Sequence, residues 1–179
     1  MTYSKVILAL SVLLLCIGCG NNRQDQAPWP AKITIKGFSE AERSAVLEQL
    51  TGFSTTMGSE VFYFDDRPGQ FQITITKVDP TPETSSRAGL ATYDERSCDV
   101  ELSTTLFTEG FSRYLEPVLW HELGHCSGMG HDSKETELMY RFARLEGFYG
   151  SDAIDRFMLS FATLTHLIVK ETVAASFIN

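Results

Sequence analysis

One motif constrains this chain more than any other feature. It reads H-E-x-x-H-x-x-G-x-x-H and runs from His121 to His131 with every fixed position filled. His121 and His125 are four residues apart, so on a helix both imidazoles lie on one face. Neutral imidazole is a common zinc ligand, and catalytic zinc needs three protein ligands and one open position. Because Gly128 allows a left-handed turn at the helix end, His131 can return as the third ligand. The motif therefore predicts a site for one zinc ion.

Glu122 directly follows the first predicted ligand. A carboxylate in this position can accept a proton from a zinc-activated water molecule. We therefore interpret Glu122 as the general base of a hydrolytic enzyme. One alternative is a catalytically silent envelope lipoprotein that binds zinc or peptides without cutting them. A purely structural envelope protein is a second, weaker alternative.

The motif resembles that of the metzincins, a clan of zinc metalloproteases that share a methionine-containing turn after the third histidine. The corresponding turn here is 137–140, in which Met139 follows His131 by eight residues. The resemblance implies that Met139 lies beneath the zinc ligands without binding the metal. It also implies a zinc-dependent endopeptidase whose extended peptide or protein substrate pairs with an edge strand, here 88–93.

The N-terminus carries a targeting signal. Residues 1–18 contain Lys5 and an apolar run, 6–15, which has the length of a signal-peptide core and is too short for an ordinary membrane span. A small residue precedes Cys19, as in a bacterial lipobox, so we expect lipid attachment at Cys19 and anchoring in the cell envelope. Gly20 favours the outer membrane, if the cell has one. Plain secretion with cleavage nearby and an uncleaved anchor are the alternatives.

Composition and length suit one catalytic domain. Polar, proline-ended residues 19–30 are expected to form a tether, and residues 31–179 the metalloprotease domain. Of the 179 residues, 43% are hydrophobic and 21% charged, which is enough apolar material for a core. The net charge of −8 and the lack of a basic stripe argue against a nucleic-acid partner. We expect a monomer.

Hydrophobic periodicity predicts five strands, a first helix, a motif helix and a C-terminal helix. This order resembles that of the metzincin catalytic domain, and the resemblance implies an α+β, zincin-type fold with a twisted mixed sheet of about five strands. The first helix should begin at a Ser39–Glu42 capping box and end near Gly52. His166, alone near the C-terminal helix, is expected to be structural. The expected strands are 31–37, 60–65, 71–78, 88–93 and 98–104, with a turn joining the second to the third, and the later helices are 112–127 and one that starts at Ser151.

Two cysteines of the expected domain, Cys98 and Cys126, can meet in space. A strand over 98–104 spans about 20 Å, and a helix over 114–126 spans about 18 Å. If the helix packs antiparallel on that strand, the start of the strand lies near the end of the helix. Export permits a disulfide. Two buried free thiols and a functional thiol remain the alternatives.

Overall fold

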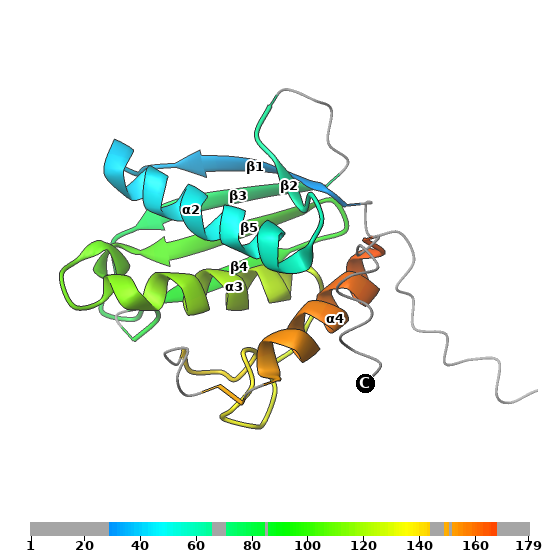
Figure 1. The fold of residues 1–179 in the computed structure, drawn as a ribbon. Helices are drawn as coiled ribbons and strands as arrows, with labels where there is room; N and C mark the ends of the chain where they lie inside the picture. The colour runs from blue at the N-terminus through cyan, green and yellow to red at the C-terminus, as the bar shows by residue number, and fades with distance from the viewer. Residues whose placement is uncertain (1–28, 66–70, 85, 144–148, 151, 168–179) are drawn as a thin grey trace, which may run out of the picture.

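A five-stranded mixed sheet forms the centre of the computed structural model, which describes residues 29–65, 71–84, 86–143, 149–150 and 152–167 (Figure 1). The strand order is β2-β1-β3-β5-β4. β4 pairs antiparallel with β5 at one edge, and all other pairs are parallel. The expectation of a mixed sheet of five strands is confirmed. The strands are β1 (Ala31–Lys36), β2 (Phe62–Tyr63), β3 (Gln72–Val78), β4 (Gly89–Tyr93) and β5 (Ser97–Ser103).

In the described part of the chain, three α-helices accompany the sheet, and α2 and α3 cross the same face of it in Figure 1. Successive side chains of a strand point to opposite faces of the sheet, and here the side chains on the face that the helices cover are apolar. Ile73, Ile75 and Val100 point inward and are fully buried, whereas Asp99 and Glu101 of β5 are exposed. The helices are α2 (Glu40–Met57), α3 (Leu115–Cys126) and α4 (Ala153–Thr165), and two short 3-10 helices are η1 (Thr104–Phe107) and η2 (Ser112–Tyr114).

The expected signal peptide, the lipid attachment site Cys19 and most of the expected tether lie outside the described residues. The end of that tether differs from the expectation. Trp29 is buried in the core, with its ring 5.2 Å from that of Phe71 and 5.0 Å from that of Phe161. Trp29 therefore belongs to the folded domain, because its large apolar ring gains from burial. No helix among the described residues has both the length and the apolar character to cross a membrane.

Helix α2 begins as expected but does not end near Gly52. The Ser39 hydroxyl accepts from the Glu42 N–H, and the Glu42 carboxylate accepts from the Ser39 N–H. The helix continues to Met57 and ends at Gly58, whose φ is 65°. The prediction was wrong because a single interior glycine costs a helix only about 1 kcal/mol. Burial of Phe53 and Met57 offsets that cost.

The second and third strands, β2 and β3, are not neighbours in the sheet, and most of the turn expected between them lies outside the described residues. β1 lies between β2 and β3 and runs parallel to both. β2 is also shorter than the expected strand 60–65. A turn-like sequence between two apolar runs cannot distinguish a hairpin from two strands separated by a third, because both leave the same local pattern.

The motif helix and the C-terminal helix form close to the expected positions. Pro117 lies in the first turn of α3, where its missing N–H has no helical acceptor to lose. Leu119, Leu123 and Cys126 are completely buried, and Trp120 is 6% exposed. These residues hold α3 against the core while its other face turns to the cleft.

A disulfide joins the start of β5 to the end of α3. Cys98 and Cys126 are 28 residues apart in sequence, and their Cα atoms are 5.5 Å apart. Both are fully buried. The bond therefore fixes the end of α3 one residue beyond His125.

Candidate metal centre and active site

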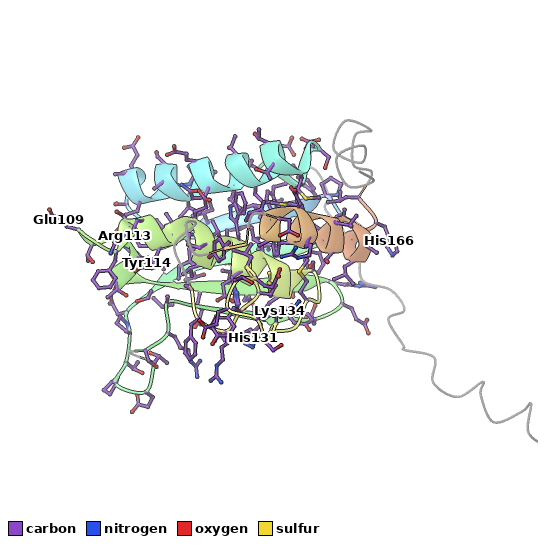
Figure 2. The ribbon with its side chains drawn as sticks, turned by 60° about the horizontal axis from the view of Figure 1, so that its bottom comes forward. Glu109, Arg113, Tyr114, His131, Lys134 and His166 are labelled. Carbon is purple, nitrogen blue, oxygen red and sulfur yellow. A yellow bond between two sulfur atoms is a disulfide. The ribbon has the colours of Figure 1, made fainter. Side chains whose placement is uncertain are left out.

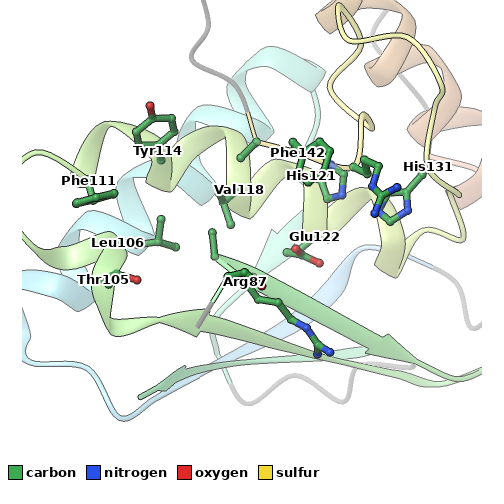
Figure 3. A pocket seen from close by; sticks show the side chains of 15 residues that line it. Arg87, Thr105, Leu106, Phe111, Tyr114, Val118, His121, Glu122, His131 and Phe142 are labelled. Atoms are coloured by element: carbon green, nitrogen blue, oxygen red, sulfur yellow. The ribbon is translucent and has the colours of Figure 1, made fainter. Parts of the chain in front are cut away.

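The three motif histidines converge on one point. α3 carries His121 and His125, and the turn after the helix carries His131. The Nε2 atom of His125 is 3.1 Å from Nε2 of His121 and 3.2 Å from Nε2 of His131. One ligand nitrogen from each ring lies within 4.8 Å of the other two. The three sequence-predicted ligands are thus brought together, and Figure 3 shows two of them, His121 and His131, side by side.

Backbone carbonyls fix the tautomers of two of these rings. His121 Nδ1 is 2.9 Å from the Leu138 oxygen, and His125 Nδ1 is 2.8 Å from the Met129 oxygen. A carbonyl oxygen only accepts hydrogen bonds, so each Nδ1 carries the proton and each neutral ring directs an Nε2 lone pair toward the other. A metal cation placed between the rings could accept these lone pairs. Ligand nitrogens around a tetrahedral zinc ion lie roughly 3.3 Å apart, given bonds of 2.0–2.1 Å. The three rings therefore fit a zinc-like metal ion.

Burial keeps two of the histidines neutral. It lowers the pKa of His121 to about 4, against the opposing effect of the hydrogen bond to the Leu138 carbonyl. Burial also lowers the pKa of His125. Neutral imidazole is the form that binds metals, so the site is prepared for a ligand role at neutral pH.

The turn after α3 has the geometry that brings His131 to the other two. Gly128 has a φ of 90°, in the left-handed region that glycine adopts without strain. The Met129 N–H donates to the Gly124 carbonyl at 3.0 Å, and the Gly128 N–H donates to the His125 carbonyl at 2.8 Å. These bonds close the helix end and redirect the chain toward the site.

Met139 packs against α3 at Gly124. A Cβ atom at position 124 would overlap Met139 Sδ and would stand 2.9 Å from Phe157 Cε2. Met139 is 7% exposed, and its backbone oxygen accepts from the Asp132 N–H at 2.8 Å. Sequence reasoning missed Gly124, which fills an unspecified position of the motif. The signal for it was a glycine inside a helix, one residue before a ligand.

Glu122 lies beside the histidines and against the edge strand. Its side chain is 6% exposed, and burial raises the pKa of its carboxyl to about 7, although the Ala91 N–H donates to it and opposes the shift. β4 approaches closely at Gly89, where a Cβ atom would stand 2.7 Å from Glu122 Oε1. Sequence reasoning missed both β4 residues, because nothing local links them to the motif.

A cavity of about 710 Å³ opens beside Glu122. Figure 3 shows it running from His131 and Glu122 to an apolar end. His121 also lines it, as do Arg87, two residues before β4, and Arg141, after the methionine turn. Leu106, Phe111 and Tyr114 line the end away from the histidines, Val118 lies between, and Phe142 lies beside His121 (Figure 3).

His166 lies apart from the site. It is exposed at the end of α4, away from His131 in Figure 2. It has a left-handed φ of 56°, so it ends the helix. Tyr140, which follows Met139, directs its hydroxyl toward the Glu135 carboxylate at 3.4 Å.

Comparison with known proteins shows a similarity of fold. No family model matches the chain, and no curated protein sequence matches it. The structure is similar to the crystal structure of archaemetzincin from Methanopyrus kandleri, with a TM-score of 0.54 and 14% sequence identity. The match covers 76% of this chain and 95% of that one. The chain therefore has a mixed α/β fold similar to that of archaemetzincin, with a three-histidine group that can bind a metal.

Proposed function

We propose that the protein is a zinc-dependent endopeptidase of the metzincin type. The observation that carries this proposal is the convergence of three Nε2 atoms beside a buried carboxylate at the mouth of a large cavity. His121, His125 and His131 would hold one zinc ion. When bound, zinc lowers the pKa of a water molecule and polarises a peptide carbonyl.

Glu122 acts as the general base. It takes a proton from the attacking water, whose oxygen bonds to the peptide carbonyl carbon, and it returns that proton to the leaving nitrogen as the C–N bond breaks. A pKa of about 7 suits both steps, because the group can accept and release a proton near neutral pH. The Ala91 N–H and the close approach of Gly89 hold the carboxylate on the cleft side of α3.

An extended peptide is the substrate that this cleft accommodates best. β4 pairs only with β5 in the described sheet, so its other edge can add a further strand through backbone hydrogen bonds. The cavity beside Glu122 would take one substrate side chain. Its apolar lining, with Leu106 and Val118 each 2% exposed, favours a large apolar side chain there.

The proposed place of action is the cell envelope. The lipobox-like Cys19 would carry the lipid, and the disulfide between Cys98 and Cys126 suits an oxidising compartment outside the cytoplasm. Replacement of Cys19 by serine should release the protein from the membrane fraction and abolish incorporation of labelled palmitate. If the Cys19→Ser variant stays in the membrane and keeps the label, the lipid proposal is wrong.

Metal analysis and a peptide-library cleavage assay test the enzymatic proposal. The purified protein should contain one zinc ion per chain and cut extended peptides, and a chelator should stop the cleavage. Glu122→Gln should retain zinc and lose on the order of 10²–10⁴-fold in kcat. If the wild-type protein binds zinc but cuts no peptide in the library, it is a zinc-binding lipoprotein without hydrolytic activity.

A further inference from the structure

The methionine turn, Glu137–Tyr140, contacts the surroundings of two of the three histidines. The Leu138 carbonyl accepts the Nδ1–H of His121 at 2.9 Å. The Met139 carbonyl accepts from the N–H of Asp132 at 2.8 Å, directly after His131. The position of this turn therefore sets both the ring orientation of His121 and the path of the segment that carries His131.

Arg156 of α4 holds this turn from outside. Its Nη2 donates to Glu137 Oε1 at 2.6 Å, and its Nε donates to Glu137 Oε2 at 3.2 Å. Such a fork adds geometric specificity to the attraction, because both parallel bonds must be satisfied together. Arg156 Nη1 also contacts the carboxylate of Asp152, the residue directly before α4. The Glu137 side chain is only 12% exposed, so the pair lies against the protein surface.

Backbone hydrogen bonds around Glu137 fix its position relative to Leu138, the next residue. The Tyr140 N–H donates to the Glu137 carbonyl at 3.1 Å, which closes the turn around Leu138. The Gly150 N–H donates to the Thr136 carbonyl at 2.9 Å, so the chain before α4 also pairs with the chain before the turn. The Leu138 carbonyl thus lies one residue from a carboxylate that α4 clamps.

We propose that Arg156 is a positioning residue for the metal centre: it clamps Glu137 and thereby holds the Leu138 carbonyl that orients His121. This inference rests on the metal site of the proposed function. A carbonyl that accepts from a ligand histidine fixes its tautomer and ring plane, and loss of such partners commonly weakens metal binding 10–100-fold. Arg156 acts one step farther away, so we expect an effect at the lower end of that range.

The chain offers a matched control. Lys77 of β3 pairs with Glu42 of α2 at 2.7 Å, with side chains 21% and 24% exposed. This pair joins the sheet to a helix that carries no candidate ligand. Ion pairs of this kind contribute little to stability, with a median of about 0–1 kcal/mol. Loss of either ion pair should therefore leave the protein folded, and only loss of the pair between Arg156 and Glu137 should weaken metal binding.

The experiment measures zinc affinity by competition with a chromophoric chelator in the full chain. Arg156→Met should weaken zinc binding roughly tenfold. Arg156→Lys retains a cation that can donate to Glu137, so it should recover part of the loss. Lys77→Met should match the wild type. With cobalt in place of zinc, the visible absorption bands of Arg156→Met should shift, because they report the ligand geometry around the ion.

Three outcomes would overturn the inference. Unchanged zinc affinity and an unchanged cobalt spectrum in Arg156→Met would show that the clamp does not reach His121. An equal loss in Lys77→Met would assign the effect to general stability. A wild-type protein without metal affinity would remove both this inference and the proposed function. If instead the wild type binds zinc and cuts peptides while Arg156→Met behaves identically, only the role of Arg156 is wrong.

Discussion

Gly89 of the edge strand lies directly against the carboxylate of Glu122 on the motif helix. A Cβ atom at position 89 would stand 2.7 Å from Glu122 Oε1 and 2.9 Å from both Glu122 Cγ and Val118 Cγ1. The carboxylate and the helix that carries it thus pack on the backbone of β4. The strand that would bind substrate in the proposed function therefore also positions the proposed general base.

Replacement of Gly89 by alanine should impair catalysis and spare the metal. The methyl group forces Glu122 or β4 to move, and a misplacement of about 1 Å commonly costs 10²-fold in rate. We expect kcat for peptide cleavage to fall by that order while zinc content stays at one ion per chain. Gly52→Ala is the control, since a Cβ atom at position 52 meets only Trp120, at 4.0 Å. Full activity in Gly89→Ala would mean that the space at Gly89 is not needed.

The ionisation of Glu122 should make the metal-free protein less stable at higher pH. Burial raises the pKa of this carboxyl in the folded state from 4.5 to about 7. Between these values the folded state binds more protons than the unfolded state, so stability falls as pH rises to about 7 and is then constant. The loss is roughly 3 kcal/mol at 1.36 kcal/mol per pKa unit.

Glu122→Gln removes this titration and provides the comparison. Urea unfolding of chelator-treated proteins at pH 4.5 and pH 8 should show that the variant gains on the wild type by roughly 3 kcal/mol at the higher pH. His121, whose pKa burial lowers to about 4, titrates in both proteins and cancels from the difference. A difference that does not change with pH would contradict the buried carboxylate.

Short sequence patterns were sufficient to predict the parts of the candidate site that lie on one continuous segment. The spacing of His121 and His125 fixes their common helix face, and Gly128 has the positive φ that the turn requires. Trp29 shows the limit of such local patterns. Its polar, proline-rich neighbours led to the prediction of a tether, although its aromatic ring is buried in the core. Burial of that ring depends on Phe71 and Phe161, which no local window contains.

The remaining features depend on pairing between distant segments. β1 separates β2 from β3, so the sheet order could not be derived from the turn between them. Gly89 and Ala91 reach Glu122 only because β4 folds back antiparallel on β5 beside α3. The meeting of Cys98 and Cys126 was derived from element lengths, since a strand and a helix of similar length bring their opposite ends together.

Loss of the disulfide should destabilise the domain without removing the metal ligands. In the chain-entropy account, a cross-link between residues about 28 apart contributes about 3–4 kcal/mol. The Cys98→Ser/Cys126→Ser double variant should therefore unfold at a clearly lower urea concentration than the oxidised wild type. Reduced wild-type protein should behave like the variant. If reduction does not change the midpoint of the wild type, the two cysteines are not linked in the isolated protein.

Gly124 and Met139 should be coupled energetically, because the side chain of one occupies the space that a Cβ atom on the other would need. Gly124→Ala introduces a methyl group that overlaps Met139 Sδ and stands 2.9 Å from Phe157 Cε2, so it should cost about 1–3 kcal/mol through overpacking. In a Met139→Ala background the same change should cost less, since only the contact with Phe157 remains. Urea unfolding of the four proteins gives the coupling, for which we expect at least about 0.5 kcal/mol. Strict additivity would mean that Met139 does not pack on α3, and its proposed position beneath the metal site would then be wrong.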